Sequence, residues 1–228
     1  MAALELERLS ASYGRARVLF DVDLKLDAGE VVVLAGRNGA GKSTTLKAVM
    51  GLVRPDSGAV LFGGRRIDGL QPFEIARLGL GYVPEDRRIF TDLTVAENLE
   101  VGRKAPREGI VSWTAERLFA LFPPLAAMRE RLAAQMSGGE QQMLTIARTL
   151  MGNPAALLLD EPSEGLAPKV VQAIEKAILE LKANGLAVLL CEQNLAFARR
   201  VGDRAYFLEQ GHARHAGPMS ELQENLLG

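Results

Sequence analysis

The chain opens with hydrophobic residues that alternate with polar ones, which is the two-residue period of a β-strand. Leu4, Leu6 and Leu9 roughly alternate with charged residues, which predicts an edge strand that ends in a turn at residues 10–14. Val31–Leu34 is an apolar, β-branched run before a glycine-rich segment, the pattern of a strand buried on both faces of a parallel sheet. The same reasoning predicts strands at 18–26 and 59–62, a turn at 55–58, and helices at 44–50 and 72–78.

From about residue 91 to residue 136 the hydrophobic period lengthens to that of helices, with breaks near Pro106 and Pro123. The β/α alternation then resumes. It predicts a strand at 156–159, a helix at 168–184, a strand at 186–191 and a last strand at 206–208. We therefore expect right-handed parallel β-α-β units interrupted by a helical insert.

The composition and charge of the chain exclude several classes of protein. The 228 residues are 48% hydrophobic and 24% charged, as in a packed globular protein. Lys and Arg number 27 against 28 Asp and Glu, so no bulk positive field attracts DNA or RNA, and we expect no nucleic-acid partner. Cys191 is the only cysteine, which excludes an internal disulfide and favours a reducing compartment. The acidic start lacks an export signal, and the apolar runs fall short of the roughly 18 residues of a membrane helix.

Residues 36–43 read Gly-Arg-Asn-Gly-Ala-Gly-Lys-Ser and match the phosphate-binding loop between a predicted strand and a predicted helix. Glycines let the backbone wrap around phosphates, so that its N–H groups face the anion. Lys42 can reach the β- and γ-phosphates, and the Ser43 hydroxyl can bind Mg²⁺. The candidate nucleotide-binding residues here are Gly36, Asn38, Gly39, Ala40, Gly41, Lys42, Ser43 and Thr44.

Asp160 and Glu161 follow the apolar strand at 156–159, at the sheet edge where doubly wound folds bind ligands. Asp160 is placed to hold Mg²⁺, and Glu161 to orient or deprotonate the attacking water. By itself, such an acidic pair is also typical of a simple helix N-cap. Together with the phosphate loop, it favours a catalytic site.

A second anion-binding helix start is predicted at residues 137–142, Ser-Gly-Gly-Glu-Gln-Gln. Ser137 and Glu140 also fit a capping box, and a well-capped helix without further role is the alternative. Two phosphate-binding segments in one chain indicate a shared site, to which Ser137, Gly138 and Gly139 would contribute.

In this order, the motifs resemble the ATP-binding-cassette (ABC) ATPases over essentially all 228 residues. Residues 36–43 resemble Walker A, 137–141 the signature motif, 157–161 Walker B and 163–168 the D-loop. The resemblance implies an α/β fold, a P-loop NTPase core with a mixed, largely parallel sheet, an N-terminal antiparallel β subdomain and an inserted α-helical subdomain. It also implies one domain, 1–228, with 91–152 as the helical part and 1–90 and 153–228 as the rest. Tyr13 matches the aromatic residue that stacks on adenine, although packing on its own subdomain is the alternative.

Two positions depart from the common family pattern. Glu85 follows Tyr-Val-Pro where glutamine is usual, and Gln193 stands at the usual switch histidine. Both departures are similar to the second, shorter ATPase of branched-chain amino acid importers. The resemblance then implies Glu161, Lys42, Gln193 and Glu85 as catalytic residues, and Ser43, Asp160 and Glu85 as Mg²⁺ ligands.

The resemblance implies a cytoplasmic ATPase subunit, peripheral on the inner face of the cell membrane, that uses ATP and Mg²⁺ to power an importer. It would dimerise with itself or with a paralogous ATPase, contact permease subunits through Glu85–Phe90, and serve a periplasmic binding protein indirectly. A solvated basic loop is the alternative for Arg87 and Arg88. The rival functions are a urea or amide importer of the same subgroup and a soluble, non-transport ABC ATPase. A P-loop GTPase or kinase would have no reason to carry the motif at 137–141.

Overall fold

The centre of the molecule is a six-stranded sheet whose inner strands are apolar on both faces. The computed structural model describes residues 2–221. The strand order is β10-β9-β3-β8-β7-β6, and all neighbouring pairs from β9 to β6 are parallel. Every residue of β3, β7 and β8 is buried, as predicted for strands covered on both faces. The strands are β3 (Val31–Ala35), β6 (Leu80–Val83), β7 (Ala156–Asp160), β8 (Ala187–Glu192), β9 (Arg204–Glu209) and β10 (His212–Pro218).

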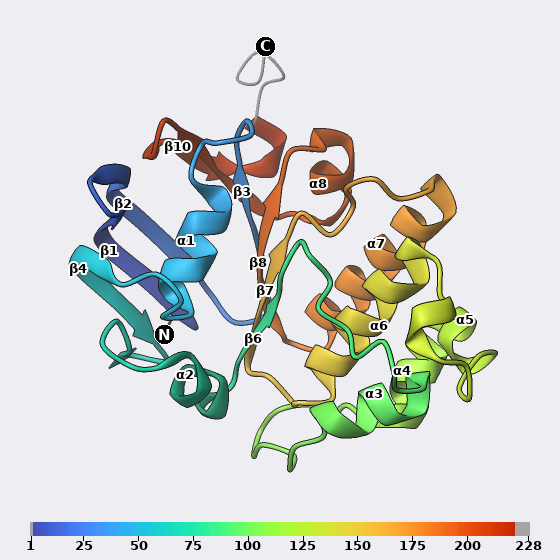
Figure 1. Cartoon of the computed structure of the whole chain (residues 1–228). Helices are drawn as coiled ribbons and strands as arrows, with labels where there is room; N and C mark the ends of the chain where they lie inside the picture. The colour runs from blue at the N-terminus through green and yellow to red at the C-terminus, as the bar shows by residue number, and fades with distance from the viewer. Residues whose placement is uncertain (1, 222–228) are drawn as a thin grey trace.

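A second sheet of four antiparallel strands stands beside the first (Figure 1). Its order is β2 (Ala16–Leu26), β1 (Leu4–Tyr13), β4 (Pro55–Phe62) and β5 (Arg65–Arg66). The expected edge position of the first strand is wrong, because β1 pairs with both β2 and β4.

The turns expected at 10–14 and 55–58 are also largely strand. Ser10 is buried within β1, and its hydroxyl accepts hydrogen bonds from the Asp21 amide and from Arg17. The polar residue is therefore satisfied inside the sheet. Residues 55–58 begin β4, where Ser57 pairs with Ser10 beside an irregularity in the register. Turn-forming residues thus mark a bulged strand here.

Helix α1 (Lys42–Val49) fills the space between the two sheets (Figure 1). Leu46 and Val49 belong to one apolar cluster with leucines of β1 and β2 and with Leu158 and Leu189 of the central sheet. Helix α2 (Pro72–Leu78) begins and ends as predicted, with Pro72 in its first turn. The phosphate-binding loop is therefore anchored between two sheets.

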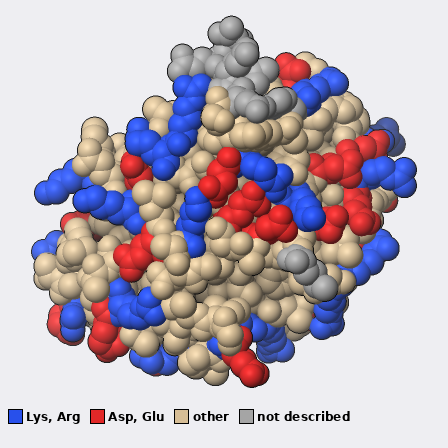
Figure 2. Space-filling model, turned by 180° about the vertical axis from the view of Figure 1, so that it is seen from behind, with Lys and Arg blue, Asp and Glu red and all other residues tan. Residues whose placement is uncertain are grey.

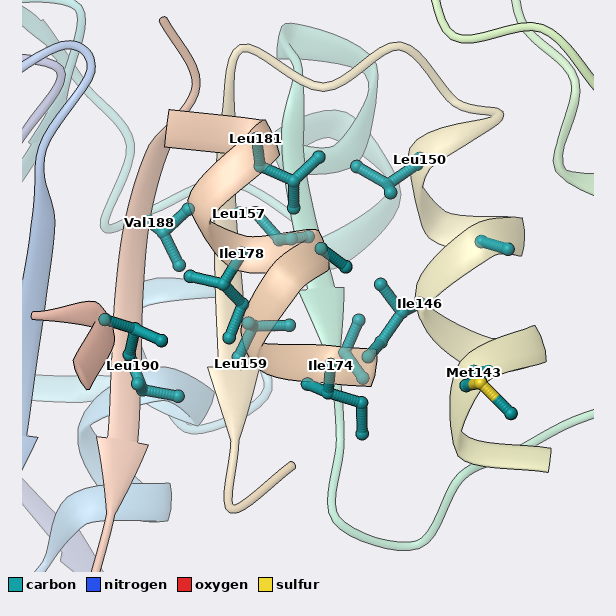
Figure 3. Close-up of a cluster of buried hydrophobic side chains, with 14 of the residues drawn as sticks. Met143, Ile146, Leu150, Leu157, Leu159, Ile174, Ile178, Leu181, Val188 and Leu190 are labelled. Atoms are coloured by element: carbon teal, nitrogen blue, oxygen red, sulfur yellow. The ribbon is translucent and has the colours of Figure 1, made fainter. Parts of the chain in front are cut away.

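Three helices cover the other face of the central sheet: α6 (Gly138–Leu150), α7 (Pro168–Ala183) and α8 (Leu195–Val201). Ile174, Ile178 and Leu181 of α7 recur at helical spacing and are buried. Figure 3 shows them between the apolar side chains of β7 and β8 and those of α6. The apolar face of α7 is therefore the face that packs on the sheet.

The segment between β6 and α6 is helical, as its hydrophobic period predicts. It contains α3 (Val95–Gly102), α4 (Ala115–Leu121) and α5 (Pro123–Ala126), and it lies on the side away from the antiparallel sheet (Figure 1). The chain also has the 3-10 helices η1 (Ala133–Gln135) and η2 (Met219–Glu221). None of the helices in residues 2–221 is long and apolar enough to cross a bilayer. Basic and acidic side chains are interspersed over the face shown in Figure 2.

Candidate functional site

The loop between β3 and α1 forms a pocket of about 560 Å³ that is open to solvent. The close packing around this loop requires glycine at two positions. Gly41 has φ 109°, and a Cβ on it would lie 2.8 Å from Leu19. A Cβ on Gly36 would collide with the carbonyl oxygen of Leu208. The pocket brings together residues from the loop and from distant segments: Val18, Asn38, Gly39, Gly41, Lys42, Ser43, Thr44, Glu85, Glu161 and Glu164.

Lys42 is bound inside this pocket to groups of the protein itself. Its Nζ donates to the carbonyl oxygens of Gly36 (2.9 Å) and Arg37 (3.2 Å). It also forms an ion pair with Glu161 at 2.9 Å, and the two side chains are only 3% and 6% exposed. The ammonium group of Lys42 is therefore paired with Glu161, the carboxylate expected to act on water. Phosphate oxygens would compete with Glu161 for this ammonium group.

The carboxylate of Glu161 has several polar partners. Gln193 donates from Nε2 to Glu161 Oε2 at 2.8 Å and to Asn38 Oδ1 at 2.6 Å. Burial opposes ionisation of Glu161, but hydrogen bonds from Glu164, Lys42 and Gln193 outweigh burial and lower its pKa. Glu161 is thus a carboxylate at neutral pH, and its left-handed φ of 45° marks a strained turn.

Asp160 presents hard oxygen atoms beside the phosphate pocket. Ser43 Oγ donates to Asp160 Oδ1 at 2.8 Å, and the Tyr82 hydroxyl donates to Oδ2 at 3.2 Å. Burial raises the pKa of Asp160 despite these bonds. No cluster of three His, Cys, Asp or Glu residues suited to a metal occurs within residues 2–221. A hydroxyl and one carboxylate fit Mg²⁺, which keeps few protein ligands and takes the others from phosphates and water.

The segment at 137–139 lies outside the phosphate pocket of its own chain. Ser137 caps α6 and forms the predicted capping box with Glu140, whose carboxylate accepts from the Ser137 amide at 2.7 Å. The guanidinium of Arg87 lies against Gly138, where a Cβ would collide with it. One chain therefore does not bring its two anion-binding segments together.

Of the two remaining candidate residues, Glu85 lines the phosphate pocket and Tyr13 does not. Tyr13 is 49% exposed at the end of β1, so much of its ring is open to a ligand. Glu85 lines the phosphate pocket and also a neighbouring groove. Its position allows contact with either.

Sequence reasoning assigns no role to Glu192, which is 2% exposed at the end of β8. Its carboxylate accepts from the backbone amides of Ser163 (3.1 Å), Gln193 (3.0 Å) and Asn194 (3.2 Å). Burial raises its pKa. Glu192 thereby joins the turn after Glu161 to the segment that carries Gln193. Its only signal in the sequence is an acidic residue ending an apolar strand.

Glu164 lies in the segment that resembles the D-loop, but the sequence assigns it no role of its own. Its carboxyl shares a hydrogen bond with Glu161, which together with burial and nearby carboxylates raises its pKa to about 7. Protonated Glu164 therefore donates to Glu161 in the folded chain. A raised pKa in the folded state stabilises the fold below the unfolded-state value, and this stability is lost as pH rises towards 7.

We expect the melting temperature of the nucleotide-free chain to fall, relative to that of Glu164→Gln, between about pH 5 and pH 8. Glutamine donates an N–H to Glu161 at every pH, so the variant lacks this dependence. Thermal unfolding of both proteins across this range measures the difference, in which all other titrating groups cancel. Parallel curves for the two proteins would contradict the shared hydrogen bond.

A groove of about 770 Å³ lies beside the phosphate pocket. Exposed apolar side chains line it, with Phe73 57% and Phe90 48% exposed, and Leu52 and Val101 nearby. Its border, residues 84–90, is fastened to α6: Thr145 Oγ1 donates to the Arg87 carbonyl at 2.5 Å, and Arg148 donates to the Arg88 carbonyl. An apolar surface of this kind is typical of a protein interaction site.

Comparison with known proteins agrees with this geometry. Residues 19–164 match the family model described as ABC transporter. The high-affinity branched-chain amino acid transport ATP-binding protein BraG of Pseudomonas aeruginosa is 43% identical over 91% of this chain and 89% of BraG. The lipopolysaccharide export system ATP-binding protein LptB of Haemophilus influenzae is 38% identical over 99% of this chain and 94% of LptB. A solved ATP-binding subunit of an ABC transporter has a TM-score of 0.83 and 33% identity, covering 96% of this chain and 91% of that chain.

Proposed function

This chain belongs to the ABC transporter family, and from that premise we propose that it is the ATPase subunit of a branched-chain amino acid importer. Family membership establishes an ATP-hydrolysing subunit of a transporter. The observation that carries the finer assignment is the similarity to BraG along nearly the whole chain. The pattern of Glu85, Arg87, Arg88 and Gln193 supports it. Because LptB proteins are nearly as similar, export of a lipid is the second candidate.

The pocket supports hydrolysis by an attacking water. Lys42 exchanges Glu161 for oxygens of the β- and γ-phosphates and stabilises the charge on the group in transfer. Glu161, released from the ion pair, accepts a proton from water as the water oxygen bonds to the γ-phosphorus. The bond from that phosphorus to the bridging oxygen breaks, and the electron pair leaves with ADP. Gln193 donates its amide N–H to the γ-phosphate without carrying charge.

Ser43 and Asp160 are the residues that would hold Mg²⁺, with Glu85 close enough to the pocket to join them. When bound, the ion neutralises charge on the phosphates. Ser43 and Asp160 already lie within hydrogen-bond distance of each other, so both side chains could bind the same Mg²⁺ ion.

We expect two chains to share each ATP. The signature residues Ser137–Gly139 do not line the phosphate pocket of their own chain, so a second chain would bring its copy to cover the nucleotide. The partner is a second copy or a paralogous ATPase. Tyr13, half exposed at the end of β1, would stack on adenine.

The groove beside Glu85 is the proposed docking surface for a permease subunit. Its exposed Phe73 and Phe90 form an apolar contact surface, and the loop at 84–90 connects it to α6. Docking there would place the subunit at the inner face of the membrane. On this proposal, residues 1–228 act as one ABC ATPase domain whose helical part, about 91–152, moves with the permease. A periplasmic binding protein would deliver the substrate on the far side.

Uptake measurements test the transported substrate. In the source cell, deletion of this chain should abolish most high-affinity uptake of radiolabelled leucine, and the native chain should restore it. Glu161→Gln should not restore uptake, because the catalytic carboxylate is lost. Phe90→Asp should also fail while keeping its nucleotide binding, since it charges only the docking groove.

Normal leucine uptake in the deletion strain would contradict the amino acid assignment. Loss of urea uptake would favour the rival importer, and loss of lipopolysaccharide at the cell surface would favour export. ATP hydrolysis by the purified chain in all these cases would leave the ATPase assignment intact.

A further inference from the structure

Tyr82 connects the groove to the carboxylate of Asp160. It lies at the end of β6, paired in register with Leu158 of β7, two residues before Asp160. Its hydroxyl donates to Asp160 Oδ2 at 3.2 Å, while Ser43 donates to Oδ1 at 2.8 Å. Each oxygen of the carboxylate is therefore held from a different side.

The hydroxyl of Tyr82 has no packing function. The ring packs against the apolar cluster between the two sheets, which a phenylalanine ring would also do. A half-buried hydroxyl lowers stability unless it is hydrogen-bonded, and here its partner is Asp160.

Tyr82, Glu85 and Asp160 all line the groove, whereas Ser43 lines the phosphate pocket. The Asp160 carboxylate therefore connects the two spaces, because it lines the groove and accepts a hydrogen bond from Ser43 of the phosphate pocket. A side chain that fixes Oδ2 on the groove side determines how Oδ1 is presented on the phosphate side.

We propose that Tyr82 is a positioning residue that orients the Asp160 carboxylate for Mg²⁺, linking the groove to the metal. The proposal rests on the proposed role of Asp160 as a Mg²⁺ ligand. Hydrogen-bond partners of metal ligands orient those ligands, and their loss weakens metal binding by about 10–100-fold.

The test measures binding of a fluorescent, non-hydrolysable ATP analogue to the purified full chain, in EDTA and over a series of Mg²⁺ concentrations. Tyr82→Phe should raise the Mg²⁺ concentration at half-maximal enhancement about tenfold and leave the affinity in EDTA unchanged. Tyr206→Phe is the matched control, because its hydroxyl accepts from the Lys25 amide and it lines neither the phosphate pocket nor the groove. It should behave as the native chain.

The variant Asp160→Asn distinguishes failure of the proposed metal site from failure of the proposed role of Tyr82. If Asp160→Asn shifts the Mg²⁺ dependence and Tyr82→Phe does not, the role of Tyr82 is overturned and the metal site stands. If neither variant shifts it, the proposed metal site fails and the inference fails with it. An equal loss of affinity with Mg²⁺ and in EDTA would show that Tyr82 serves only packing, which also overturns the proposal.

Discussion

Lys42→Ala is expected to lower the rate of ATP hydrolysis by at least about 10²–10³, the usual effect of removing one electrostatic stabiliser. Arg37, the other basic residue of the loop at 36–43, does not line the phosphate pocket, so it does not replace the charge of Lys42. Release of inorganic phosphate by the purified chain, assembled with its partner subunits, measures the effect.

The same substitution leaves the Glu161 carboxylate in place without its cation. The nucleotide-free variant should therefore melt at a lower temperature than the native chain, since an unpaired buried charge destabilises the fold. Lys25→Ala removes an exposed lysine on β2 and should change neither property. Near-native turnover by Lys42→Ala would overturn the assignment of this loop.

Glu161→Gln should slow hydrolysis by about 10²–10⁴, the contribution of a general base, while ATP still binds. Binding should in fact tighten. In the native chain Lys42 must leave an ion pair of 2.9 Å before it meets phosphate, and a neutral glutamine holds it less strongly. ATP that is bound but not consumed should then hold two chains together by mass action.

Gel filtration with ATP and Mg²⁺, together with nucleotide titration, checks both expectations. Glu180→Gln, an exposed change on α7, is the control. A monomeric Glu161→Gln that binds ATP, alone and mixed with a paralogous ATPase, would contradict the shared site. Unchanged ATP affinity would show that the ion pair does not compete with the nucleotide.

Much of the fold follows from the period of the apolar residues. Strands β3, β7 and β8 and helices α2 and α7 lie within one or two residues of their predicted bounds. The sequence does not predict α8, nor β6, whose four residues are too few to establish a period. The strand at 206–208 was expected to be the last, but β10 follows it. The polar residues of β10 give no strand signal in the sequence, and the strand is recognised only by its pairing with β9.

The candidate site, too, is predicted only in part by the sequence. Local motifs identify Lys42, Ser43, Asp160 and Glu161 because glycine loops and acidic strand ends have short-range signatures. Their mutual contacts depend on strand order, which brings Ser43 to Asp160 across 117 residues. Glu164 was missed, since an exposed acidic residue in a turn gives no sign that its neighbour in space is another carboxylate.

Cys191 has a practical use. It is the only cysteine of the chain, it is fully buried in β8, and burial raises the pKa of its thiol. A maleimide reagent therefore reacts with a cysteine introduced at the surface long before it reaches Cys191. Because Cys191 pairs in register with Asp160, its own slow labelling reports how often the middle of the sheet opens. The native chain thus adds little background labelling to probes placed at its surface, and the labelling rate of Cys191 measures the opening of β7 and β8.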